Sequence, residues 1–177
     1  DERDSQYVGE QRMVMELDAA EVICLTLCSA ESERVQDEAF RLGKNMLNRG
    51  FTEGQDKFLQ FFTNKDPESL FFFAIRDRIR ACRHALTDYT TAKEINEASA
   101  EKFKAPCEQI LQIFNFMAQL CEGHNLETQN ILREQPYALK TCNLFEESLD
   151  FVVLQGKNMA EVRQMNSFEA ELLESTL

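Results

Sequence analysis

The chain has 177 residues, of which 44% are hydrophobic and 28% are charged, and this composition excludes an intrinsically disordered protein. Lysine and arginine total 19 against 31 aspartates and glutamates, which gives a formal net charge of −12. A surface this acidic argues against nucleic acid and an anionic membrane leaflet as partners and suits cations or basic protein surfaces. No stretch approaches the roughly 20 apolar residues of a membrane-spanning helix, so no direct span is predicted here.

The cysteines show no CxxC pair; they are Cys24, Cys28, Cys82, Cys107, Cys121 and Cys142. Cys24 and Cys28 fall on one face of a predicted helix beside leucine and isoleucine, which is typical of buried thiols. With no signal peptide, the cysteines indicate a reduced, cytosolic compartment. Because the sequence begins at Asp1 rather than methionine, we expect the natural start to lie upstream.

Helices are predicted along most of the chain. Asp18 is a candidate cap for a helix over 19–29, whose apolar residues nearly surround it, so we expect this helix to be buried. A helix over 31–47 follows and ends before Gly50. Its predicted inward stripe consists of Val35, Ala39, Leu42 and Met46.

Two capping patterns predict the starts of the next helices. Thr52 and Gln55 form a capping box ahead of a phenylalanine-rich helix. Asp66, Pro67 and Glu68 together predict a helix start, with a cap, a proline at the first helical position and an acid in the first turn. The inward residues predicted for this helix are Leu70, Phe73, Ile75, Ile79, Cys82 and Leu86.

The opposite side of that helix carries an arginine cluster: Arg76, Arg78, Arg80 and Arg83. This cluster has two interpretations. Either it binds an anion or an acidic neighbour, or it is an exposed face whose positive charge balances the excess of acidic residues elsewhere in the chain.

Residues 90–105 are polar and poor in apolar anchors, and we interpret them as a linker or a weakly packed helix. Pro106 then opens an apolar helix over 107–121, which Gly123 ends, and Asn125 caps a short helix that runs to Glu134.

The C-terminal part is predicted to hold two more helices. The first covers about 138–154 with Gly156 as its stop, and the second covers 158–174 with Asn158 and Glu161 as a capping pair.

No strand-like alternation is long enough to build a sheet, so the predicted fold is all-α, an irregular armadillo-like α-solenoid or a stack of helix hairpins. The apolar helices 19–29 and 107–121 are expected at its centre. The predicted segments are an N-terminal extension (1–17), a first helical group (18–89), the polar linker or weak helix (90–105) and a second helical group (106–177).

The corner Cys-Glu-Gly-His-Asn at 121–125 has three possible interpretations: a plain helix stop, a metal site, or a nucleophile with its base. Cys121 ends an apolar helix and should face the core, and the other histidine, His84, has no evident acid partner. No catalytic motif is present, so we expect no enzyme. The cysteines and histidines are also too irregularly spaced for four zinc ligands.

A hard cation fits this corner better than zinc does. Glu122 lies in the last turn of a helix, where the negative end of the dipole disfavours a carboxylate by a few tenths to about 1 kcal/mol. A neighbouring lysine or arginine, or a bound cation, should offset this cost. Calcium prefers oxygen ligands but needs six or more of them, so one glutamate alone makes an incomplete site.

Residues 110–135, ILQIFNFMAQLCEGHNLETQNILREQ, resemble the signature of the RIH-associated domain of intracellular calcium-release channels, the inositol trisphosphate receptors and ryanodine receptors. Residues 19–62 are similar to the helices that precede this motif, and the resemblance covers about 18–155. The matching signature positions are Leu120, Cys121, Glu122, His124, Asn125, Gln129, Asn130, Leu132, Arg133 and Gln135.

The resemblance implies an armadillo-like helical section on the cytoplasmic face of the endoplasmic or sarcoplasmic reticulum, which couples ligand and calcium binding to pore gating. It implies that Glu122 is a calcium ligand and that His124 lies close to the ion as a supporting residue. The family's second acidic ligand follows in a Thr-Glu-Tyr motif that this sequence lacks, and a further ligand comes from beyond the pore. The implied partners are the remaining domains of a large, homotetrameric channel chain.

A different class of function also fits these residues. A stand-alone helical scaffold or adaptor would keep the fold and use its concave surface to bind a protein partner. The size of the native polypeptide separates the two, because a channel requires a pore and ligand-binding domains in addition to this chain.

Overall fold

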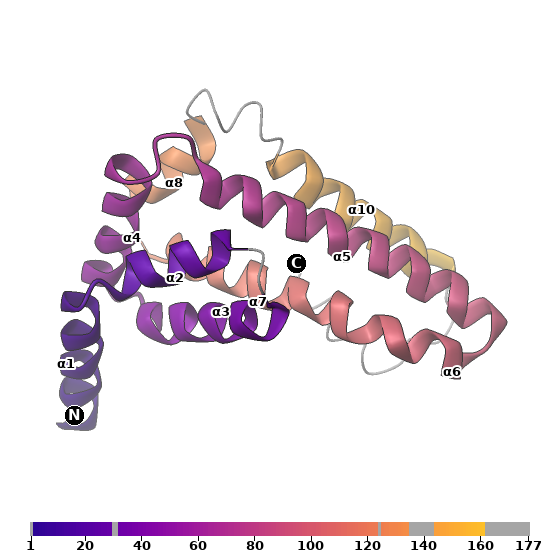
Figure 1. Cartoon of the computed structure of the whole chain (residues 1–177), viewed down its shortest axis with the longest axis horizontal. Coiled ribbons are helices and arrows are strands. Elements are labelled where there is room, and N and C mark those ends of the chain that lie inside the picture. Colours follow the sequence, from indigo (N-terminus) through magenta and orange to yellow (C-terminus); the bar gives the residue numbers. More distant parts are fainter. Residues whose placement is uncertain (1, 30–31, 124, 135–143, 162–177) are drawn as a thin grey trace.

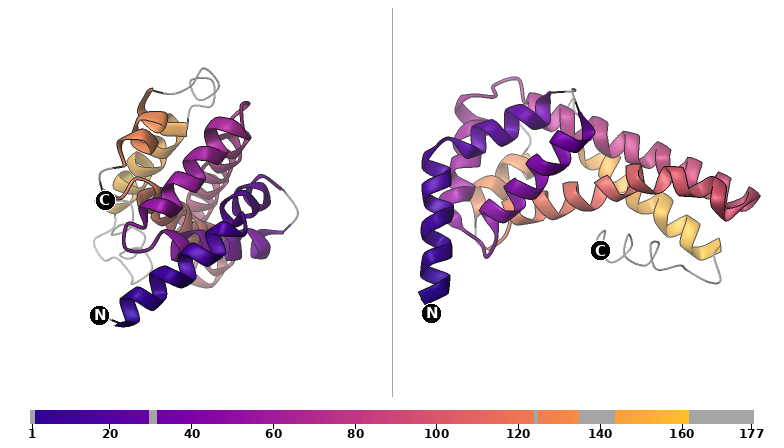
Figure 2. Two further views of the ribbon diagram at one scale, coloured as in Figure 1. Left: turned by 90° about the vertical axis from the view of Figure 1, so that its left-hand side faces the viewer. Right: turned by 60° about the horizontal axis from the view of Figure 1, so that its bottom comes forward.

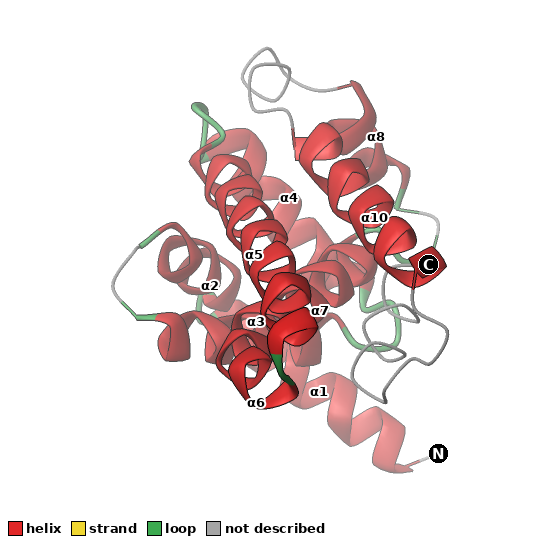
Figure 3. Cartoon of the chain, turned by 90° about the vertical axis from the view of Figure 1, so that its right-hand side faces the viewer, coloured by secondary structure: helices red, strands yellow, loops and turns green. Residues whose placement is uncertain are grey.

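The computed structural model describes residues 2–29, 32–123, 125–134 and 144–161, which form helices joined by turns, with no strand among them (Figure 3). The predicted all-α class is confirmed. The armadillo-like stacking stays a prediction. The elements are α1 (Glu2–Glu16), α2 (Ala19–Cys28), α3 (Glu33–Leu47), α4 (Thr52–Asn64), α5 (Leu70–Ile95), α6 (Glu97–Ala100), the 3₁₀ turn η1 (Glu101–Phe103), α7 (Lys104–Leu120), α8 (Leu126–Glu134) and α10 (Leu144–Glu161).

Helices α5 and α7 form the centre of the molecule (Figure 1). Helix α10 lies along α5, and α3 packs against α7. Phe116 of α7 is fully buried, and its ring centroid lies 5.9 Å from that of Phe40, 5.4 Å from Phe58 and 6.3 Å from Phe71. These three rings belong to α3, α4 and α5, so α7 joins three other helices at one aromatic cluster.

At Gly43, the Phe116 ring of α7 lies directly against the backbone of α3. A Cβ added to Gly43 would lie 2.4 Å from Cε2 of Phe116, well inside the range of real contacts. Further along, a Cβ on Gly50 would lie 4.0 Å from Cδ of Glu122. The two helices therefore run in the same direction, and their C-terminal ends lie together.

The prediction that α2 is a central helix, buried all round, is wrong. Val22 and Leu25 are 57% and 55% exposed, because α2 uses one face to pack against α3, α4 and α5. Asp18 precedes it in the left-handed conformation (φ 57°) and makes no side-chain cap. The buried residues of α2 are Ala19, Ala20, Ile23, Cys24 and Leu27.

The inward stripe predicted for α3 is right at Ala39, which is buried, and at Met46, which packs against the core, but it is wrong at its other two positions. Val35 and Leu42 are exposed, and the face that packs is turned by about one position. Gln36 and Gly43 lie on this face, the first because its amide has partners and the second because α7 approaches it. The buried residues of α3 are Gln36, Ala39, Phe40, Gly43 and Leu47.

Asp66 caps the next helix, as predicted, but that helix begins later than predicted. The buried Asp66 carboxylate accepts hydrogen bonds from the backbone N–H groups of Leu70 (2.8 Å) and Phe71 (3.0 Å). Because α5 begins at Leu70, Pro67 lies in the preceding turn rather than at the first helical position. Leu70 is exposed, contrary to prediction, whereas Ile75, Ile79, Cys82 and Leu86 are buried as predicted.

Two helices run further than the sequence predicts. Helix α5 continues to Ile95, and α6, η1 and the start of α7 occupy the remainder of 90–105. Helix α10 passes through Gly156, the predicted stop, and includes Asn158 and Glu161, the predicted capping pair. The predicted start at 138 and the predicted end at 174 lie outside the described residues.

Helix α1 joins the core at its C-terminal end and extends away from the other helices at its N-terminal end (Figure 2). Met15 is buried, and the buried Gln11 donates a 2.9 Å hydrogen bond to the carbonyl of Asn45 near the end of α3. In the described part of the chain, no helix combines the length and the hydrophobicity needed to cross a membrane.

Candidate cation-binding corner

Helix α7 ends and α8 begins within a few residues, as the sequence predicts. Helix α7 ends at Leu120, and Gly123 adopts a positive φ of 73°, a conformation that favours glycine. The Asn125 side chain then accepts a hydrogen bond from the backbone N–H of Thr128 (3.1 Å) and caps α8. The helix stop and the helix cap are both confirmed.

A side chain from α4 holds this corner in place. Gln55 is fully buried, and its Nε2 donates to the carbonyl oxygens of Gln119 (2.9 Å) and Glu122 (3.0 Å). Its Oε1 accepts a hydrogen bond from Nδ2 of Asn125 (3.2 Å). The predicted capping box at Thr52 is therefore wrong, because Gln55 faces away from the start of its own helix and α4 has no side-chain cap.

A second glutamine closes the corner from α8. Nε2 of Gln129 donates to the carbonyl oxygens of Cys121 (2.9 Å) and Gly123 (3.4 Å). Carbonyls at the end of a helix have no partner within the helix and must be satisfied from outside. Gln55 and Gln129 together supply these partners, so side-chain amides fix the backbone of the turn.

The side chain of Glu122 is exposed on this fixed turn. It lies where the C-terminal ends of α3 and α7 meet, close to Gly50. Both helix ends carry partial negative charge, which favours a cation beside the carboxylate. Within the described residues, no lysine or arginine forms an ion pair with this carboxylate.

The corner offers one side-chain carboxylate to a metal. No group of three or more histidine, cysteine, aspartate or glutamate side chains suited to a metal occurs among the described residues. His124, the predicted supporting residue, lies outside them. Since calcium takes six to eight oxygen ligands, Glu122 can contribute to a calcium site but cannot form one without other ligands.

Cys121 shows the properties of a structural thiol. It is half-buried against the hydrophobic core, and burial raises the pKa of its thiol. A nucleophilic cysteine requires the opposite shift. Sequence reasoning placed this side chain correctly because Cys121 continues the apolar face of α7.

The arginine cluster of α5 contacts acidic residues of α10, which agrees with the first of its two interpretations. Nε of Arg80 donates to Oε1 of Glu147 on α10 (2.8 Å), and Nη1 of Arg83 donates to Oδ2 of Asp150 (2.6 Å). Arg78 instead donates to Oε1 of Gln36 (3.1 Å). The cluster therefore fixes α10 and α3 against α5 rather than presenting a free anion site.

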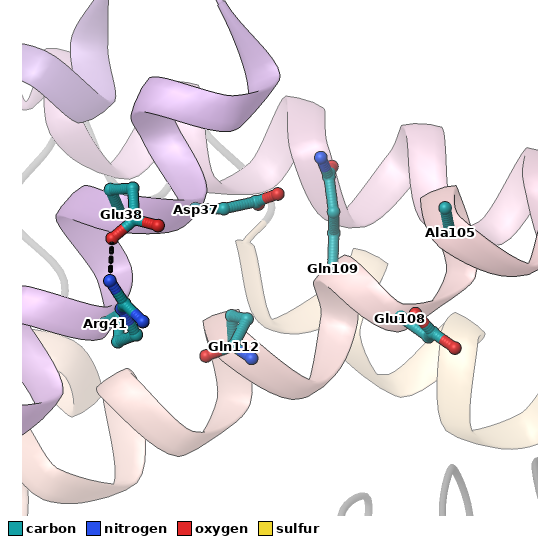
Figure 4. Close-up of a pocket in the computed structure, with 7 residues that line it drawn as sticks. All are labelled: Asp37, Glu38, Arg41, Ala105, Glu108, Gln109 and Gln112. Atoms are coloured by element: carbon teal, nitrogen blue, oxygen red, sulfur yellow. Dashed lines mark hydrogen bonds and ion pairs between the residues drawn. The ribbon is translucent and has the colours of Figure 1, made fainter.

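A polar groove of about 230 Å³ lies between α3 and α7 (Figure 4). Burial and the nearby charges of Glu33 and Glu38 raise the pKa of Asp37 at its edge. The groove lies toward the N-terminal ends of the two helices, whereas the corner lies at their C-terminal ends. Its lining residues are Asp37, Glu38, Arg41, Ala105, Glu108, Gln109 and Gln112.

The fold and the corner define an all-α module whose rigid turn exposes a single carboxylate. Residues 104–174 match the family described as RyR and IP3R Homology associated. The match includes α7, the corner, α8 and α10 and confirms the resemblance over these residues, whereas the resemblance of residues 18–103 stays a prediction. Over these residues the chain is similar to this family, whose description refers to homology with ryanodine receptors and inositol trisphosphate receptors.

Proposed function

We propose that this chain is a cytoplasmic helical section of a ligand-gated intracellular calcium-release channel and couples ligand and calcium binding to pore gating. The observation that carries the proposal is the position of Glu122. It lies within the residues matched to the channel family, on an exposed turn that buried amides hold in place. The proposal includes a homotetramer on the cytoplasmic face of the endoplasmic or sarcoplasmic reticulum.

In this proposal Glu122 supplies one carboxylate to a calcium site that other parts of the channel complete, with His124 as a supporting residue. A calcium ion that joins Glu122 to another domain would favour the channel conformation in which the two lie within bonding distance. The shift in gating would equal the difference in calcium affinity between the two conformations. This requires a turn that keeps its shape, which the contacts of Gln55 and Gln129 support.

We expect no catalytic activity from this section. The raised pKa of Cys121 disfavours the thiolate, and His84 is an exposed residue of α5 rather than a partner of that cysteine. Its role in the proposal is structural and regulatory.

Glu122→Gln tests the calcium assignment in the full-length channel. The amide keeps the size of the side chain but removes the charge, so we expect a higher calcium concentration for half-maximal opening. Single-channel recording measures this quantity. Glu127→Gln is the matched control, because Glu127 is an exposed acid in the first turn of α8 and should leave the calcium dependence unchanged. Equal calcium dependence in the wild type and Glu122→Gln would refute the assignment.

The mass of the native polypeptide tests the channel context. An antibody against residues 119–135 should detect a band of several hundred kilodaltons on a denaturing blot, because a channel chain also contains a pore and ligand-binding domains. A band near the 20.5 kDa of this chain would support the scaffold alternative and overturn the channel proposal.

A further inference from the structure

We propose that Gln55 is a positioning residue for the corner that carries Glu122, and that it couples the position of this corner to α4. The calcium part of the inference rests on the proposed function. The link between α4 and the corner rests on geometry alone. Gln55 is not part of the matched residues 104–174, so the family match does not include it.

The side-chain carboxamide of Gln55 makes three hydrogen bonds to the corner. It donates to the last turn of α7 at Gln119, donates to the carbonyl of Glu122 and accepts from the helix cap Asn125. A fully buried glutamine has two N–H donors and one oxygen acceptor, and here each of them faces a partner. The end of α7, the ligand residue and the start of α8 are thereby fixed by the same group.

The two glutamines at the corner differ in where they come from. Gln129 lies 6 to 8 residues from the carbonyls that it caps, so it moves together with the corner. Gln55 lies 64 to 70 residues from its partners and belongs to a helix that packs on α1, α2, α3 and α8. A displacement of α4 must therefore move the backbone of Glu122 or break these hydrogen bonds.

The backbone contact matters because the carboxylate itself has no described partner that holds it. A metal ligand is usually oriented by hydrogen bonds behind it, and loss of such a partner typically weakens metal binding by about 10- to 100-fold. At Glu122 the described support acts on the carbonyl of the same residue. Gln55 thus fixes the backbone position from which the Glu122 side chain extends.

Gln55→Met tests the link in the full-length protein. Methionine keeps the length and burial of the side chain but loses both donors and the acceptor. Hydrogen exchange read by mass spectrometry should show amides in 119–130 exchanging about tenfold faster, because buried carbonyls lose their partners.

Gln36→Met is the matched control for this experiment. Gln36 is also buried and also donates to a carbonyl at a helix end, that of Ser29 after α2 (2.5 Å). This variant should lose comparable stability but leave the exchange of 119–130 unchanged. Equal exchange at 119–130 in the two variants, or no change in Gln55→Met, would overturn the positioning role.

Channel recordings separate this inference from the proposed function. We expect Gln55→Met to raise the calcium concentration for half-maximal opening by roughly tenfold or more, with no change in Gln36→Met. A shift in Glu122→Gln without one in Gln55→Met would overturn the calcium part of the positioning role. No shift in Glu122→Gln would refute the calcium site itself, and the exchange experiment would still decide whether Gln55 holds the corner.

Discussion

Buried glutamines close the C-terminal ends of several helices in this protein. Gln11 donates to carbonyls at the end of α3, Gln36 to the residue after α2, and Gln55 to the end of α7. Each glutamine comes from a different helix than the one that it closes. Because a buried carbonyl without a partner is costly, each of these amides makes one helix end depend on the position of another helix.

At the scale of single residues, Glu147 provides a test of a buried charge. Its side chain is 8% exposed and pairs with Arg80 and with Arg83, whose Nη2 lies 3.1 Å from Oε2. Glu147→Gln leaves both guanidinium groups beside a neutral amide. We expect a loss of about 1–3 kcal/mol in the free energy of unfolding, toward the lower end because Arg80 is partly solvated.

Urea unfolding measures this loss, and an exposed pair supplies the control. Glu53 pairs with Arg12 on the surface, so Glu53→Gln should have little effect. A loss no larger than that of the control would show that water already screens the Glu147 pairs.

The sequence predicted some corner residues and missed another for a physical reason. Gly123 and Asn125 act on their immediate neighbours, and short patterns of helix stops and caps predict such local effects. Gln55 acts across 64 residues or more, so no local pattern identifies it. Its position in the Thr52 capping pattern also suggested a local role that the fold does not use. The signal that could have found it is a glutamine at an inward position of a phenylalanine-rich helix.

At the scale of helices, hydrophobic periodicity predicted the presence of the elements better than their faces. It placed Val35 and Leu42 inward on α3, although Gln36 and Gly43 are the residues that pack. Hydrophobicity alone does not identify a polar residue with partners, or a glycine at a close helix contact, as inward. Helix α5 was predicted more accurately, because most of its inward residues are large and apolar.

Gly43→Ala tests the close approach of α3 and α7. The new Cβ would meet the Phe116 ring at 2.4 Å in a core that is already filled. Overpacking of this kind costs about 1–3 kcal/mol, which should exceed the gain of up to about 1 kcal/mol in helix propensity. Thermal unfolding should therefore show a lower midpoint for this variant.

Gly9→Ala is the opposite case on α1. Nothing lies within 4 Å of its new Cβ, so the gain in helix propensity should remain and the midpoint should rise. If both alanine variants raised the midpoint, Phe116 would be able to move aside and the contact would not constrain the two helices.

At the scale of the whole molecule, buried thiols predict a loss of stability at alkaline pH. Burial raises the pKa of Cys82 and of Cys107 from an ordinary value of 9.0 to about 12. Between these values the folded protein retains protons that the unfolded chain releases. The free energy of unfolding should therefore fall above about pH 9, by up to about 1.4 kcal/mol per pH unit for each thiol.

Urea unfolding between pH 8 and 11 measures this slope. In Cys82→Ala/Cys107→Ala the pH slope is the relevant quantity, and it should become shallower. An unchanged slope would assign the alkaline loss to other groups. Well below pH 9 both thiols are protonated in either state, so neither should add a pH dependence there.

The aromatic cluster around Phe116 has a consequence for the order in which the protein is made. Phe40, Phe58 and Phe71 are synthesised before α7, as is Gln55, so each emerges from the ribosome without its partner. Contacts over such long separations in sequence slow folding and expose unfinished surfaces. Helices α3, α4 and α5 therefore remain open to chaperones, or to aggregation, until α7 inserts the ring that they surround.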